Sequence, residues 1–360
     1  MKTLPLFPPL FLSYPQHAHI TAILQNHIEH TSEWIIENYL TINCFMDKTK
    51  KYAPFIVEIG HVDRDNRFLA RKWEECPFLK VKIHDDDLVQ KKWNSLSSFA
   101  KDAIDSQYYV NVCIYPQSIK AYHLGAAELH PILIHGYDEE QKMLFCSDHF
   151  GSPPRYTSIW IPYSEIDESF QQKLSIKKDP YIDIDSLGGV ALWEFVPNGL
   201  RFFEYDDDFT FSLDKISHRL HQHIDQTTFS DNSYEKTYGV VTGLEVYTKI
   251  IEVFLQDPSI FFRTLGNFQV LLDHKTVLTM LIDSCEQILG WPSDDLKSKI
   301  NSLIAHLKFT RSLMLKMITR QPLTYRESPR IVDNLIIAKS VEKELIESIL
   351  TWINNNKKAF

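Results

Sequence analysis

The alternation of apolar and polar residues divides the chain into three stretches. Residues 16–41 have the periodicity of two short helices. Between residues 55 and 197, short runs rich in β-branched and aromatic residues predict strands, and some of them are separated by helical periods. From about residue 210 the strand signal ends, and long amphipathic patterns predict helices. The pattern therefore predicts an α+β part followed by an all-α part.

The strand signal is confined to short runs in the first part of the chain. These runs are residues 55–60, 78–84, 108–115, 130–137, 143–148, 156–162 and 189–197. The polar stretch 225–239 is rich in turn-forming residues, so we place the domain boundary there. Two domains are expected, an α+β domain over residues 1–230 and an all-helical domain over residues 231–360.

Two of the predicted strands carry a histidine and an aspartate at their outer ends. If the loop between 130–137 and 143–148 centres on Glu139, His130 lies directly opposite Asp148, with Cβ atoms about 5 Å apart. An aspartate there can accept the imidazole N–H, fix the tautomer and stabilise the imidazolium. A pair of this kind usually serves a nucleophile, although a hairpin can also carry the two residues by chance.

Composition narrows the classes of protein that the chain can belong to. The net charge of -9 disfavours a nucleic-acid binder, which needs a basic face. Five scattered cysteines without a CxxC motif favour a reduced, cytoplasmic setting over a disulfide framework or a thiolate zinc site. No apolar run reaches 18 residues, and prolines interrupt the apolar N-terminus, so neither a membrane span nor a signal peptide is expected. Nucleotide-loop and zincin motifs are missing, and no cofactor or metal is expected.

The stretch YHLGAAELHPILIHGYDEEQKMLFCSDHFG (122–151) resembles the core block of the papain-like family named after the N-terminal domain of butirosin biosynthesis protein H. In that family, a strand reading His-x-Ile-Leu-Ile-x-Gly-Tyr-Asp is followed by a strand ending in Asp. The residues that match are His130, Gly136, Tyr137 and Asp148. Further blocks resemble the family in the same order, namely SEWIIENYLTINC (32–44), IPYSEIDESF (161–170), YGVVTGLEVYTKIIEVFL (238–255) and VLLDHKTVLTMLI (270–282).

The resemblance implies a papain-like domain followed by a helical domain. It also implies an acyltransferase of antibiotic or other secondary-metabolite biosynthesis, of the nonribosomal peptide or polyketide type. Such an enzyme takes an acyl chain from the thioester of an acyl or peptidyl carrier protein and passes it to a small-molecule amine. The family pattern has a Cys–His–Asp constellation, with the Cys at the N-terminus of the first helix, where the helix dipole and an imidazole lower the thiol pKa.

This chain departs from that pattern at the nucleophile. The Cys is expected at positions 16–18, where Gln16, His17 and Ala18 stand. Cys44 is predicted at the far end of the second helix, so it would have to be brought across the fold. Whether the chain is an enzyme at all therefore stays open at this point.

Four interpretations remain. The chain can be a catalytically inactive binding or scaffold protein of the same pathway. His130 with Asp148 can act as a general base directly on an amine or water. His17 can replace the cysteine as nucleophile. His17, His130 and Asp148 can instead form a metal-dependent site.

Other polar residues have simpler interpretations. The pairs His17/His19 and His221/His223 are spaced by two, which places their side chains on different sides of a helix and disfavours a shared metal. His274, in LLDHKTV, is predicted to pack or hydrogen-bond inside the helical part. Residues 308–330 carry six basic residues and one acidic residue. They are a candidate docking face for an acidic carrier protein or an ordinary solvated helix face.

Overall fold

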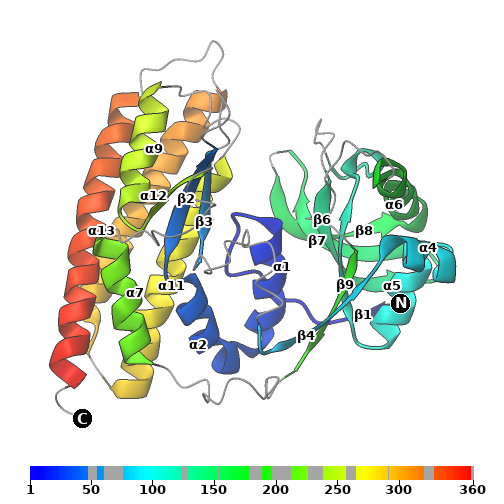
Figure 1. The fold of residues 1–360 in the computed structure, drawn as a ribbon, viewed down its shortest axis with the longest axis horizontal. Coiled ribbons are helices and arrows are strands. Elements are labelled where there is room, and N and C mark those ends of the chain that lie inside the picture. Colours follow the sequence, from blue (N-terminus) through cyan, green and yellow to red (C-terminus); the bar gives the residue numbers. More distant parts are fainter. Residues whose placement is uncertain are drawn as a thin grey trace. The chain divides into compact units, whose positions relative to one another are not determined.

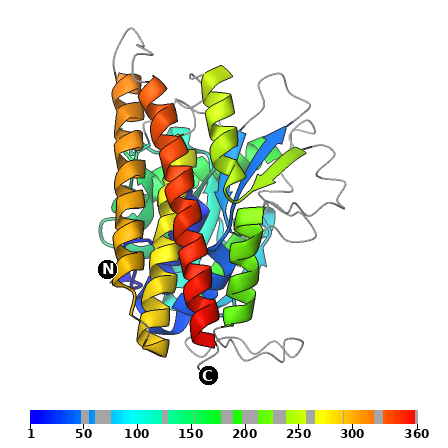
Figure 2. The same cartoon turned by 90° about the vertical axis from the view of Figure 1, so that its left-hand side faces the viewer.

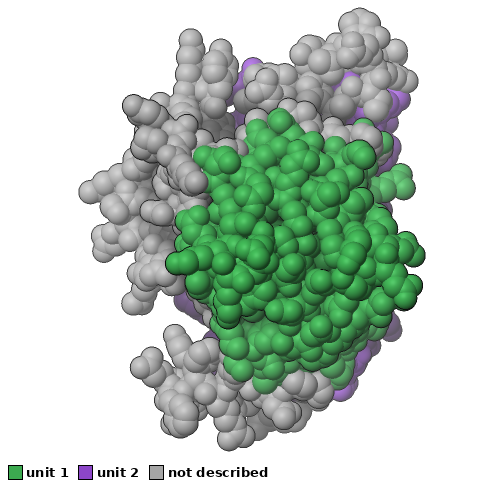
Figure 3. Space-filling view, turned by 90° about the vertical axis from the view of Figure 1, so that its right-hand side faces the viewer, with its two compact units in different colours: residues 1–31, 71–206 green, residues 32–70, 207–360 purple. Residues whose placement is uncertain are grey.

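The computed structural model divides the chain into two compact units. Unit 1 comprises residues 1–31 and 71–206, and unit 2 comprises residues 32–70 and 207–360 (Figure 3). The residues that the structure describes are 1–47, 55–60, 76–122, 129–152, 154–177, 189–196, 212–225, 238–256, 265–290, 292–319 and 328–357. An antiparallel sheet and C-terminal helices confirm the predicted α+β class. The papain-like fold stays a prediction.

Unit 1 is built on an antiparallel sheet (Figure 1). Its strands are β1 (Lys2–Thr3), β4 (Leu79–His84), β5 (Tyr109–Ile114), β6 (His130–Asp138), β7 (Met143–Phe150), β8 (Arg155–Pro162) and β9 (Val190–Phe195). The strand order is β4-β9-β5-β6-β7-β8, and β1 pairs with β6. The helices of the unit are α1 (Pro15–Leu24), α4 (Asp86–Trp93), α5 (Leu96–Asp105) and α6 (Tyr163–Lys177), with short 3₁₀ turns η1 (Gln25–His27) and η3 (Pro116–Ser118).

Local sequence explains how these elements begin and where they pack. The Asp85 side chain accepts hydrogen bonds from the backbone N–H groups of Asp87 and Leu88, so Asp85 caps the N-terminus of α4. Helices α5 and α6 contact β5, and α1 contacts β6 and β7. Buried aliphatic residues of β5 and β6 form the centre of the core. This packing holds α1 against the two strands that carry His130 and Asp148.

Unit 2 combines a small sheet with long helices. The strands β2 (Ile42–Asp47), β3 (Phe55–Ile59) and β10 (Tyr238–Thr242) form an antiparallel sheet in the order β10-β2-β3. The helices are α7 (Leu213–Asp225), α9 (Glu245–Gln256), α11 (Leu265–Leu289), α12 (Asp294–Thr319) and α13 (Ser328–Lys357). Figures 1 and 2 show α11, α12 and α13 running side by side, and α11 also contacts β3. Helix α2 (Ile28–Tyr39) begins in unit 1 and ends in unit 2.

The predicted domains differ from these units. The two compact units do not follow a single boundary near residue 230, because residues 32–70 group with the C-terminal helices. The second part is not all-helical either, since β2 pairs with β10 from Tyr238↔Asp47 to Thr242↔Asn43. Cys44 lies in β2, and not at the end of a helix. Residues 226–237 of the predicted boundary lie outside the described residues.

No helix within the described part of the chain has both the length and the apolar character that crossing a membrane requires.

Candidate functional site

His130 and Asp148 meet in unit 1, on neighbouring strands. His130 is the first residue of β6, and its Nδ1 lies 2.8 Å from Oδ2 of Asp148 on β7. The contact was predicted, but the predicted register was wrong by two residues, since Ser147 pairs with Leu133 and not with Pro131. A displacement of two keeps every side chain on its face of the sheet, and diagonal neighbours remain within reach of long side chains.

Asp148 is fully buried and is surrounded by hydrogen-bond donors and imidazoles. The Tyr122 hydroxyl donates to Oδ2, the oxygen that also faces His130. Nδ1 of His149 lies 3.5 Å from Oδ1, and Nε2 of His19 lies 3.9 Å from it. Burial alone would raise the pKa of Asp148, but the hydrogen bond from His130 and the nearby imidazoles outweigh it and hold the pKa below its ordinary value. Asp148 is therefore a carboxylate at neutral pH.

His130 has the geometry of a general base. Burial alone would lower its pKa, but the hydrogen bond to Asp148 and the charge of that carboxylate raise the pKa above 6.5. Nδ1 donates to Asp148 and also lies 3.1 Å from the carbonyl oxygen of Pro131. Nε2 is thus the nitrogen left to exchange a proton, and 24% of the side chain is exposed. A buried carboxylate that fixes one imidazole nitrogen and leaves the other free is the arrangement of a proton-transferring histidine.

Helix α1 brings His19, and not His17, to this carboxylate. Gln16 and His17 lie in the first turn of α1, half-buried and buried respectively, and neither is among the contacts of Asp148. His19 is buried, and its Nδ1 lies 3.1 Å from Oδ1 of Asn111. Burial lowers the pKa of His19 to about 4, so its ring is neutral at pH 7. The structure therefore does not assemble the predicted His17–His130–Asp148 metal site.

Sequence reasoning gave His19 no role beside Asp148. Its only signal was the His17/His19 pair, and that spacing does not say which of the two faces the sheet. His19 lies in the second turn of α1, and the packing of α1 on β6 and β7 brings this histidine to Asp148.

None of the five cysteines is a thiolate at neutral pH. Burial raises the pKa of the Cys113 thiol to about 11 and that of the Cys285 thiol to about 12. Burial also raises the thiol pKa of Cys44, Cys76 and Cys146 far above the ordinary value. All five residues are among those described, and none has the electropositive, accessible setting of a catalytic cysteine. A covalent cysteine mechanism therefore has no candidate residue in this chain.

A serine–histidine contact also lies inside the same sheet. Nε2 of His135 lies 2.8 Å from Oγ of Ser147, which lies 2.6 Å from Oγ of Ser158. Nδ1 of His135 lies 3.4 Å from the carbonyl oxygen of Leu4. His135 and Ser147 are buried, and burial lowers the pKa of His135 to about 4. This closed network satisfies buried polar groups and offers no nucleophile to a substrate.

Two further features that the sequence indicated, the His221/His223 pair and the basic stretch 308–330, lie in unit 2. His221 is exposed on α7, whereas His223 is buried, which confirms that the spacing directs the two rings to different sides. Lys308 is exposed on α12, and the Arg330 guanidinium lies 5.5 Å from the Phe309 ring centroid. Residues 320–327 of the basic stretch lie outside the described residues.

No protein-family model matches the chain, and no curated protein matches it. The resemblance to the butirosin biosynthesis protein H family therefore stays a prediction, and the function has to be argued from the site.

Proposed function

We propose that the chain catalyses acyl transfer in the biosynthesis of a secondary metabolite, with His130 as a general base and without a covalent acyl-enzyme. The substrate is an acyl or peptidyl thioester on a carrier protein, and the acceptor is a small-molecule amine. The observation that carries the proposal is the hydrogen bond between Nδ1 of His130 and the buried Asp148 carboxylate, on a histidine side chain that is 24% exposed.

The proposed reaction balances without a further reactant. As the amine nitrogen attacks the thioester carbonyl, Nε2 of His130 takes the proton that the nitrogen loses. A C–N bond forms, the C–S bond breaks, and the imidazolium returns the proton to the departing thiolate of the carrier. The Asp148 carboxylate stabilises the imidazolium between the two proton transfers. Water in place of the amine would give hydrolysis by the same steps.

A second candidate is a binding or scaffold protein of the same pathway that performs no chemistry. The raised pKa values of the five thiols and the residues at positions 16–18 favour it, because the nucleophile of the resembled family is not replaced by another thiolate. In this role the protein would hold the carrier-borne acyl group for another enzyme.

The test is turnover of a panel of acyl-carrier thioesters with amines, followed by release of the carrier thiol and by intact mass. We expect amide formation without an acyl adduct on the chain. His130→Ala should reduce turnover about 10²–10⁴-fold, the usual contribution of a general base. His221→Ala is the matched control, because His221 is exposed on α7 and lies outside the site.

Three outcomes would reject this mechanism. Turnover that survives His130→Ala would exclude His130 as the base. A stable acyl adduct would point to covalent catalysis. Carrier binding without turnover for any thioester would favour the scaffold role.

A further inference from the structure

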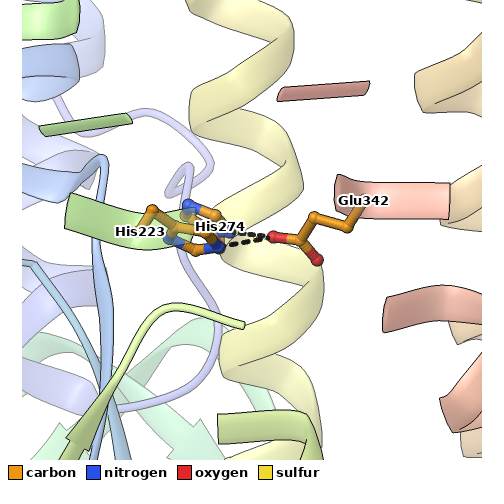
Figure 4. A group of neighbouring side chains, drawn as sticks. All are labelled: His223, His274 and Glu342. Atoms are coloured by element: carbon orange, nitrogen blue, oxygen red, sulfur yellow. Dashed lines mark hydrogen bonds and ion pairs between the residues drawn. The ribbon is translucent and has the colours of Figure 1, made fainter. Parts of the chain in front are cut away.

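Unit 2 contains a second cluster of titratable side chains, remote in sequence from the hairpin. His223 on α7, His274 and Lys275 on α11, and Glu342 on α13 are all fully buried. Figure 4 shows both imidazole rings directed at one oxygen of the Glu342 carboxylate. The rings are nearly parallel, with centroids 4.9 Å apart and 14° between their planes. Nothing in the proposed acyl transfer uses these residues.

The three donor atoms have the spacing of metal ligands. Nε2 of His223 lies 3.1 Å from Oε1 of Glu342, and Nδ1 of His274 lies 3.3 Å from the same oxygen. All three atoms are within 4.8 Å of one another. Ligands at about 2.0–2.1 Å from a tetrahedral zinc ion lie about 3.3 Å apart, so the two separations from Oε1 of Glu342 fit such an ion. Two histidines and one glutamate are also donor types that zinc accepts.

Neighbouring groups hold two of these ligands in the required orientation. Nε2 of His274 donates to the carbonyl oxygen of Leu40 at 2.9 Å, which leaves Nδ1 with its lone pair toward the cluster. The Tyr247 hydroxyl donates to Oε2 of Glu342 at 2.5 Å, which leaves Oε1 toward the two histidines. Metal-binding histidines and carboxylates commonly have such outer partners, which fix the tautomer and the side-chain direction.

A positively charged group, the Lys275 ammonium, already lies beside the donor atoms of His274 and Glu342. Nδ1 of His274 and Oε1 of Glu342 are both acceptors, and two acceptors at that separation repel unless a cation or a donor lies beside them. The Lys275 ammonium provides it, 2.5 Å from Oε1 of Glu342 and 2.7 Å from Nδ1 of His274. The cluster is therefore organised around a cation, and Lys275 supplies it in this structure.

We propose that His223, His274 and Glu342 form a binding site for one divalent transition-metal ion of the zinc type, which takes the place of the Lys275 ammonium. All three ligands are fully buried, and a tetrahedral ion held by three protein ligands takes a water molecule as its fourth ligand. The ion would join α7, α11 and α13. This proposal does not depend on acyl transfer, because its residues lie in unit 2.

The test uses the full-length protein, stripped with a chelator and dialysed against Zn²⁺. We expect about one zinc ion per chain by elemental analysis. Co²⁺ should give the visible absorption bands of a tetrahedral site in the unmutated protein, a readout that needs no variant. Tyr247→Phe should weaken Zn²⁺ binding about 10–100-fold, as the loss of an outer partner does elsewhere.

Variants separate this site from adventitious histidine binding. His274→Ala and Glu342→Gln should abolish binding, and their folding is checked by circular dichroism. His223→Ala should also abolish it, whereas His221→Ala, two residues away on the exposed side of α7, should leave it unchanged. Lys275→Met should tighten Zn²⁺ binding by about tenfold or more, because it removes a competing positive charge.

Several results would overturn the proposal. The unmutated protein could take up no metal, or His221→Ala could lower uptake as much as His223→Ala. Zinc binding by Lys275→Met alone would show that Lys275 is the permanent cation of the native chain, and this too rejects the proposal.

Discussion

At the scale of the residue, the two oxygens of the Asp148 carboxylate have different neighbours. Oδ2 accepts from His130 and Tyr122, while Oδ1 faces His149 and His19 at longer distances. The charge of Asp148 therefore acts most directly on His130. This asymmetry links one buried carboxylate to the proton affinity of one partly exposed imidazole.

Asp148→Asn should lower the pKa of His130. The hydrogen bond and charge of Asp148 are what raise that pKa against the effect of burial, so their loss leaves burial dominant. Titration of the His130 ring by NMR measures the change in pKa, with His221 as an exposed reference. The raised pKa also means that the pair stabilises the fold fully below about pH 6.5 and loses that contribution as pH rises through the folded value. An unchanged His130 pKa in Asp148→Asn would contradict this account.

His130 and Asp148 could be found from the sequence, and their neighbours could not. The pair lies on two strands joined by a short turn, and an error of two residues in register left the side chains on one face. His19 lies 129 residues before Asp148 (148 minus 19). The position of His19 beside Asp148 depends on how α1 packs on the sheet. No local sequence pattern reports a contact between residues so far apart in the chain.

At the scale of the element, two glycines with left-handed backbone lie at the ends of helices or strands. Gly243, between β10 and α9, has φ +59°, and Gly290, after α11, has φ +65°. A Cβ at Gly243 would lie 2.0 Å from the carbonyl oxygen of His223, whereas a Cβ at Gly290 would meet nothing within 4 Å. Gly243 therefore permits the backbone approach that places α7, and with it His223, against the turn before α9.

Gly243→Ala should destabilise the protein more than Gly290→Ala. Both substitutions carry the left-handed backbone cost of about 1 kcal/mol, but only Gly243→Ala also forces the His223 backbone to move. Urea unfolding of the two variants measures the difference directly. Equal midpoints would show that the contact between Gly243 and His223 carries no stability.

The strand runs between residues 78 and 162 were predicted within one or two residues, because each has a local β signal. The strands β2 and β10 were not predicted, because the residues around each of them follow another pattern. Residues 42–44 directly follow a helix and continue its apolar pattern, and residues 238–239 fall at the end of a polar stretch that is typical of a domain boundary. The two strands pair with each other across a long separation in sequence, so no local period reveals them.

At the scale of the whole molecule, both units bury neutral histidines. Burial lowers the pKa of His19 and His135 in unit 1 and of His274 in unit 2 to about 4. Burial also lowers the pKa of His223. The unfolded chain binds protons at these positions near pH 6.5, whereas the folded chain does not bind them until the pH is much lower.

Acidification from about pH 6.5 to pH 4 should therefore destabilise both units. A lowered histidine pKa gives stability that is present above the unfolded pKa and is lost as pH falls below it, and lowering a pKa by one corresponds to about 1.4 kcal/mol. Urea midpoints at pH 7.5, 6 and 5 should fall in that order. His130 acts in the opposite sense, since its pKa is raised. A midpoint constant over this range would mean that these rings are protonated or solvated in the folded state.

The interleaving of the two units has a consequence for synthesis on the ribosome. Strand β10 begins 191 residues after β2 ends (238 minus 47), and β2 pairs with β10 on one edge and β3 on the other. At translation rates of about 5–20 residues per second, β2 and β3 wait roughly 10–40 s for their third strand. Unit 1 can complete its sheet earlier, when β9 emerges and inserts between β4 and β5. The nascent chain thus holds an early two-stranded ribbon whose β2 edge stays without its partner strand until the last third of the chain arrives.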